Sequence, residues 1–115
     1  MSTHDFQDIP IACSLSAQEF STRKDENKGL LHEIEEIKEL EDGYALKFTG
    51  SAEQVQGLLQ FITQERACCP FFRFELHFEP QNGPVWLSLS GPDGTKGFIQ
   101  EMIDAQVLRA LGYSA

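Results

Sequence analysis

Apolar and polar residues alternate along five stretches of the chain, which is the pattern of β-strands that bury one face. Asp42-Gly43 separates the second stretch from the third, and Asp-Gly is a strong signal for a tight β-hairpin. A second turn, at Gln81-Asn82-Gly83-Pro84, separates the fourth stretch from the fifth. The five predicted strands are residues 9–15, 33–40, 44–48, 72–78 and 85–89.

The last two strands carry the clearest one-face pattern. Their inward residues are predicted to be Phe72, Phe74, Leu76, Phe78, Val85, Leu87 and Leu89. Their outward residues are predicted to be Arg73, Glu75, His77, Trp86, Ser88 and Ser90. Because strict alternation leaves one wet face, we expect this outward side of the sheet to be open to a partner.

Apolar residues recur with a helical period in three other regions. Capping boxes open the first two helices, at Ser16–Glu19 and Ser51–Gln54. The second helix runs from about Ala52 to Cys69. Its predicted apolar stripe is Val55, Leu58, Leu59, Ile62 and Cys69. The third helix starts near Thr95, can run on to Leu111, and places on one face Phe98, Ile99, Met102 and Ile103.

The predicted element order is therefore β-α-β-β-α-β-β-α. Two hairpins and a β-α-β start predict an α+β domain, with a mainly antiparallel sheet and its helices on one face. The first six elements have the order of a split β-α-β, ferredoxin-like plait. Residues 1–8 are predicted to be a flexible polar tail, and residues 9–115 a single domain long enough to bury a core.

Charge and composition exclude several classes of function. The chain has 18 acidic and 9 basic residues and a formal charge of −9. This argues against nucleic acid and against anionic membranes, which both attract basic surfaces. No apolar run is long enough to cross a bilayer, and residues 1–10 lack the features of a signal peptide. Three cysteines without an export signal predict reduced thiols in a cytoplasm.

The candidate chemistry is concentrated where the second helix ends, at two adjacent thiols followed by Pro70. At 100° per residue Cys69 projects into the apolar stripe and Cys68 onto its shoulder, with Glu65 between them. Cys13 has the inward parity of the strand 9–15. These four residues are therefore predicted to form a site for zinc or another soft metal ion, which binds thiolates and carboxylates.

Other interpretations of the same residues stay open. Buried cysteines often act as small hydrophobic residues, and structural zinc sites usually space their cysteines by two to four residues. Cys68 and Cys69 can instead form a strained vicinal disulfide, or Cys68 can serve as a sensing thiol. No Cys-His or Ser-His arrangement is visible, so no catalytic set is predicted. The segment 91–96 lacks P-loop order, although Lys96 near a helix start can attract an anion.

Several motifs resemble a group of short, uncharacterised bacterial proteins with a Cys-Cys-Pro-Phe core. The motifs are Ile11-Ala12-Cys13-x-Leu15, Glu65-Arg66-x-Cys68-Cys69-Pro70-Phe71, Phe74-x-Leu76 and Gly83-Pro84-x-Trp86-Leu87-x-Leu89-x-Gly91-Pro92. The resemblance covers most of residues 10–103. It implies no particular activity, because none is established for that group.

Two functions from different classes are therefore predicted. The first is a small cytoplasmic binding protein that uses its Cys68–Cys69 corner for soft-metal or thiol chemistry. The alternative is a non-catalytic interaction module or small-ligand module whose cysteines only pack the core. The sheet face that carries Trp86 also predicts a homodimer, since an exposed aromatic patch usually has a partner.

Overall fold

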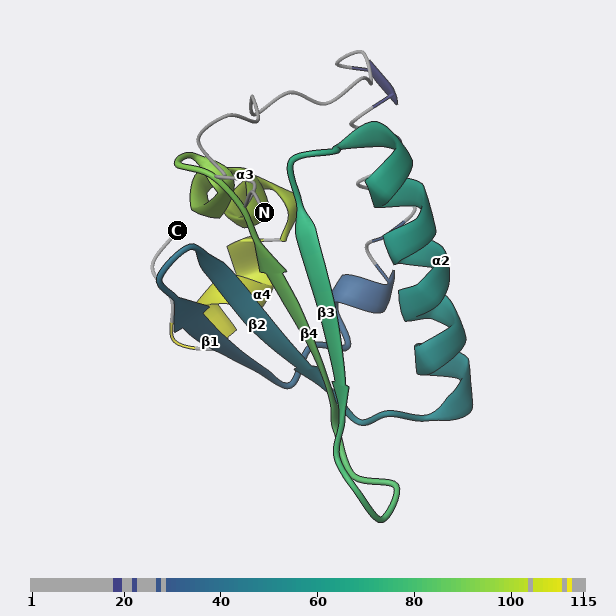
Figure 1. Ribbon diagram of the computed structural model, residues 1–115. Helices are drawn as coiled ribbons and strands as arrows, with labels where there is room; N and C mark the ends of the chain where they lie inside the picture. Colours follow the sequence, from purple (N-terminus) through teal and green to yellow (C-terminus); the bar gives the residue numbers. More distant parts are fainter. Residues whose placement is uncertain are drawn as a thin grey trace, which may run out of the picture.

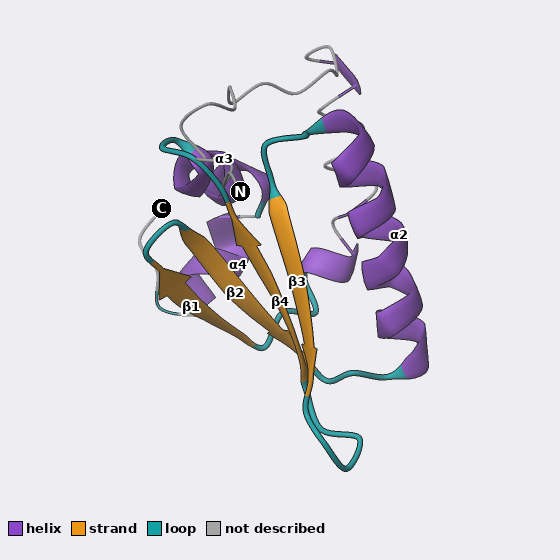
Figure 2. Cartoon of the chain, viewed as in Figure 1, coloured by secondary structure: helices purple, strands orange, loops and turns teal. Residues whose placement is uncertain are grey.

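The computed structural model describes residues 18, 19, 22, 27, 29–103, 105–110 and 112 (Figures 1 and 2). The predicted tail, the strand 9–15 with Cys13, and most of the first predicted helix lie outside these residues. The elements with defined bounds are β1 Glu36–Leu40, β2 Gly43–Phe48, α2 Ala52–Cys68, β3 Arg73–Phe78, β4 Val85–Ser90, α3 Thr95–Met102 and α4 Ala105–Ala110.

The described strands form one antiparallel sheet in the order β1-β2-β4-β3. Both predicted hairpins are present, with Leu40 opposite Gly43 in the first and Phe78 opposite Val85 in the second. Strand β4 lies between β2 and β3 and pairs antiparallel with both, so β2 and β3 run parallel to each other. Helix α2 connects β2 to β3 across β4. This is a split β-α-β unit. The predicted α+β class is confirmed, and the strand order is compatible with a plait-like arrangement.

The hydrophobic core lies on one face of the sheet. The strand residues in it share one parity: Ile37, Tyr44, Leu46, Phe48, Val85, Leu87 and Leu89. The helices add Leu58 and Phe61 from α2, Ile99 and Met102 from α3, and Val107 and Leu108 from α4. Helices α2, α3 and α4 therefore bury side chains against the same face, as the sequence predicts.

The opposite face of the sheet is polar and has small residues at its centre. Trp86, Ser88 and Ser90 point to this side, which confirms their predicted orientation. The two serines are nevertheless buried, and Trp86 is half-buried. Lys38 Nζ lies 4.5 Å from the centre of the Trp86 ring, in a cation–π contact. The exposed aromatic surface is therefore smaller than the alternation predicts.

Burial along β3 decreases toward its end, which corrects one prediction. Phe72, just before the strand, is buried, Phe74 and Leu76 are half-buried, and Phe78 is 58% exposed. The inward assignment is therefore wrong for Phe78. In Figure 1 the hairpin that joins β3 to β4 extends beyond the helices, which explains why the end of this edge strand is left uncovered. The predicted outward residues Arg73, Glu75 and His77 are exposed.

The predicted capping box fixes the start of α2. Ser51 Oγ accepts a hydrogen bond from the Gln54 N–H at 3.2 Å. Gln54 Oε1 in turn accepts from the Gly50 N–H at 2.9 Å, so the glutamine reaches back toward the preceding loop. Its Nε2 donates to Glu33 Oε1 at 3.2 Å, which connects α2 to the segment before β1.

The buried face of α2 is rotated relative to the predicted stripe. The buried residues are Leu58, Phe61, Glu65 and Cys68, whereas Leu59 is 50% exposed. The prediction is therefore wrong for Leu59. Phe61 and Leu59 lie on different sides of α2, so the helix can bury only one of them fully. Burying the large Phe61 ring removes more apolar surface from water than burying Leu59 would. Val55 and Ile62 lie half-buried at the margin.

The C-terminal helix is divided, so the prediction of one helix from Thr95 to Leu111 is wrong. At Ile103 the backbone is extended, with φ −87° and ψ 132°, although its N–H still bonds to the Ile99 carbonyl. The change of direction lets α3 and α4 each bury apolar side chains in one core. Within the described residues, no helix has the length and apolar character needed to cross a bilayer.

Candidate functional site

Pro70 determines where α2 ends and how the two thiols are presented. A proline disfavours helical geometry in the residue before it. Cys69 accordingly has φ −128° and ψ 78° and forms the C-cap, so Cys68 is the last helical residue. The Cys69 N–H still donates to the Glu65 carbonyl at 2.7 Å. The helix therefore stops one residue earlier than the periodicity predicts.

Both thiols and one carboxylate are buried at this point. Cys69 is 1% exposed, Cys68 9% and Glu65 3%. Cys69 Sγ donates to Glu65 Oε1 across 3.9 Å, within the range of a sulfur hydrogen bond. The predicted order of exposure, with Cys69 deeper than Cys68, is confirmed, but Cys68 is itself nearly buried. We call Glu65, Cys68 and Cys69 the thiol corner.

The thiol corner combines groups that can bind a soft cation once they lose their protons. Cys68 and Cys69 are present as thiols, and Glu65 supplies carboxylate oxygens. Within the part of the chain that the structure describes, no three His, Cys, Asp or Glu side chains gather as a metal-binding group. The fourth predicted ligand, Cys13, lies outside that part.

Lys96, in the first turn of α3, is paired with an acid of β1. Lys96 Nζ lies 2.7 Å from Glu39 Oε2, and this hydrogen bond raises the pKa of Lys96 above its ordinary value of 10.5. Thr95 is buried beside Gly91, and a Cβ atom added at Gly91 would come within 2.6 Å of Thr95 Oγ1. The loop before α3 therefore packs tightly against the start of the helix.

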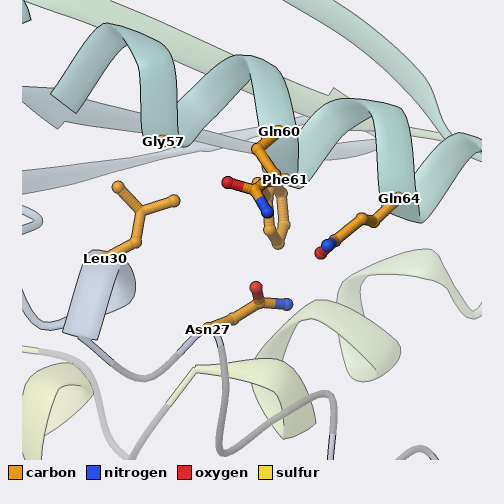
Figure 3. Close-up of a pocket in the computed structure, with 6 residues that line it drawn as sticks. All are labelled: Asn27, Leu30, Gly57, Gln60, Phe61 and Gln64. Atoms are coloured by element: carbon orange, nitrogen blue, oxygen red, sulfur yellow. The ribbon is translucent and has the colours of Figure 1, made fainter. Parts of the chain in front are cut away.

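A pocket of about 360 Å³ lies beside the middle of α2, and it was not predicted from the sequence. Its lining residues are Asn27, Leu30, Gly57, Gln60, Phe61 and Gln64 (Figure 3). In Figure 3 the amides of Gln64 and Asn27 point toward one another below the Phe61 ring. Two sequence signals were available: a glycine inside a helix, and glutamines four residues apart.

Comparison with protein-family models, with curated proteins and with solved structures found no match to this chain. The resemblance to the Cys-Cys-Pro-Phe group of bacterial proteins therefore stays an expectation based on its motifs. The function has to be argued from the geometry of the thiol corner and of the surfaces around it.

Proposed function

We propose that this chain is a small binding protein that holds a soft or borderline cation, such as Zn²⁺, at its thiol corner. One observation carries the proposal: a carboxylate only 3% exposed lies against a buried thiol, with Glu65 Oε1 3.9 Å from Cys69 Sγ. Thiolate sulfur and carboxylate oxygen are both zinc ligands, so this contact places two of the atoms that a Zn²⁺ site needs beside each other.

Two further features support a cation at this place. The C-terminal end of a helix carries partial negative charge, which stabilises a bound cation beside Cys68. Zinc in proteins is usually held by four ligands, and we propose that Glu65, Cys68 and Cys69 move together on metal binding to supply three, since the described residues hold no preformed group of three. We propose Cys13 as the fourth, on the parity of its predicted strand. The proposal keeps the cytoplasmic location predicted from the sequence, where thiols stay reduced and available to a metal.

Metal titration of the reduced, chelator-stripped protein tests this function. Zn²⁺ added in competition with a chromophoric chelator should bind at one equivalent per chain and raise the thermal midpoint, because the ligand binds only the folded state. Cys68→Ser and Cys69→Ser should each remove this binding. Cys13→Ser then decides whether Cys13 is a ligand.

The matched control compares two glutamates of α2. Glu65 is buried, whereas Glu53 is exposed in the first turn of the same helix. Glu65→Gln should weaken Zn²⁺ binding, and Glu53→Gln should leave it unchanged. If the parent protein binds no zinc, or if both variants bind it equally, the metal proposal is wrong.

A thiol reaction is the other chemistry open to this corner. A peroxide can oxidise Cys68 and Cys69 to a vicinal disulfide: each sulfur loses its hydrogen, an S–S bond forms, and the peroxide is reduced to two waters. Mass spectrometry after peroxide treatment would show the loss of two hydrogens between these residues. This result, together with absent zinc binding, would assign the corner to redox chemistry.

The alternative function, an interaction module, is favoured by the charge of the outward sheet face. This face carries Lys38, Lys47 and Arg73 against Glu36 and Glu75, whereas the whole chain has a formal charge of −9. The basic side chains of this face can pair with acidic surface elsewhere on a second copy of this chain, which is the partner we propose. Light scattering at high micromolar concentration should then show a dimer that weakens with salt. A monomer would exclude it.

A further inference from the structure

The pocket beside α2 has the composition of a binding site for a small polar molecule. Three of its six lining residues carry primary amides, namely Asn27, Gln60 and Gln64, and Leu30 and Phe61 supply apolar surface. Its volume of about 360 Å³ falls within the range of small-molecule sites. Its lining is more polar than apolar, which favours a ligand that forms several hydrogen bonds.

The amides that line the pocket are not used by the fold. Within the described residues, no hydrogen bond joins the side chain of Asn27, Gln60 or Gln64 to the protein. Gln54, on the same helix, is a useful contrast, because its amide bonds to Thr49, Gly50 and Glu33. Gln54 therefore has a structural role, whereas the pocket amides keep donors and acceptors available to a ligand.

Gly57 is the residue that opens this space. A glycine in the interior of a helix is unfavourable relative to alanine, so its presence needs a packing or functional reason. A Cβ atom at position 57 would lie 3.6 Å from Leu30 Cδ1, which is ordinary contact, so close packing of the backbone does not require glycine here. A longer side chain at this position would instead project into the pocket that Gly57 lines.

We propose that this pocket binds a small, uncharged, planar molecule with a carboxamide edge or its nucleobase equivalent. Among the described residues that line it none carries a charge, and a carboxylate would lack the donor that a carboxamide offers to the amide oxygens of the lining. A primary amide offers a donor beside an acceptor, and this pair matches the same pair on a carboxamide or on adenine. Leu30 and Phe61 supply apolar contact for the ring. None of the thiol-corner residues is among the described residues that line the pocket, and its ligand does not depend on a metal.

Titration followed by NMR chemical shifts tests the proposal with two neutral probes, nicotinamide and adenine. Binding of nicotinamide would identify a carboxamide ligand, and binding of adenine a nucleobase. The protein chemical shifts should change to saturation, and the signals of Gln60 and Gln64 should be among those that move. Nicotinate, which has the same ring with a carboxylate, should not bind. Gln64→Leu should weaken the binding probe about tenfold or more, because a buried partner is then left unpaired.

Gly57→Met is the decisive variant, because it places a side chain in the pocket without introducing a backbone penalty. It should abolish saturable binding while its thermal midpoint stays equal to the parent's or rises. Gln56→Met adds the same side chain at the exposed neighbouring position and should bind like the parent. The proposal is overturned if neither probe saturates, if Gly57→Met binds normally, or if nicotinate binds as tightly as nicotinamide.

Discussion

Helices α2 and α3 are attached to the sheet in different ways, and we call the parts of the molecule around them the α2 side and the α3 side. Helix α3 packs directly on β2, and its side chains make specific polar contacts there: Gln100 Nε2 donates to the Tyr44 hydroxyl at 2.7 Å, and Lys96 pairs with Glu39. Helix α2 buries Leu58 and Phe61 in the core from its middle turns, and the polar contacts described above lie near its two ends. Gln54 connects one end to Glu33, and the thiol corner is buried at the other.

This difference separates a side whose polar groups pair with one another from a side that holds the thiol corner and the pocket. On the α3 side, the polar groups named above are paired with one another, so they stabilise the fold. On the α2 side, a buried carboxylate lies against a thiol, and the pocket amides between the two ends are not used by the fold. The metal proposal and the pocket proposal therefore both concern α2.

The largest effect is expected at Phe71, which connects the two sides. Its ring is 1% exposed, lies 4.6 Å from the Phe72 ring and meets Phe98 of α3 edge-on at 5.1 Å. Phe71→Ala should lower the free energy of unfolding by about 3–5 kcal/mol, measured by urea denaturation. Phe78→Ala, at a 58% exposed position, should change it by no more than about 0.5 kcal/mol. Similar losses at the two positions would show that the end of β3 is covered.

A smaller effect distinguishes the two thiols of the α2 side. Cys69→Ser places a hydroxyl at a position that is 1% exposed and should cost about 1–3 kcal/mol. Cys68→Ser should cost less, because Cys68 lies nearer the surface. Urea denaturation of both variants without metal measures the difference. Equal losses would mean that Cys69 is not more deeply buried than Cys68.

Sequence patterns predicted the features that depend on neighbouring residues. The hairpins, the Ser51–Gln54 capping box and the grouping of Glu65 with Cys69 all follow from local turn chemistry or helical spacing. The exposure of Phe78 and Leu59 could not be predicted this way, because it depends on where distant helices end and on which flank of α2 meets the core. The early end of α2 was predictable, since Pro70 restricts Cys69. The pocket depends on packing between Leu30 and Gly57, which no local pattern shows.

On the α3 side, removing one hydroxyl tests the contact between Tyr44 and Gln100. Tyr44→Phe keeps the ring and loses the hydrogen bond, so the free energy of unfolding should fall by about 0.5–1.5 kcal/mol. Gln100→Ala should give a similar loss, and the double variant should lose little more than either single one. Additive losses in this cycle would show that the two side chains act independently.

The smallest effect is expected at the exposed pair of Lys96 and Glu39, and it should depend on pH. The hydrogen bond to Glu39 raises the pKa of Lys96 above 10.5, so the folded protein holds this proton more tightly than the unfolded chain does. The stabilisation is therefore fully present below pH 10.5 and is lost as the pH rises through the higher pKa of the folded state.

Thermal midpoints of the parent and of Lys96→Met, measured from neutral to strongly alkaline pH, should accordingly differ below pH 10.5 and converge above it. Added salt should reduce the difference at neutral pH, because both side chains are open to solvent. Lys47→Met is the matched control. The Lys47 amine lies 3.9 Å from Glu36, whereas the Lys96 amine lies 2.7 Å from Glu39, so Lys47→Met should give a smaller difference. A difference for Lys96→Met that stays constant into strongly alkaline solution would mean that the ammonium charge does not hold α3 against β1.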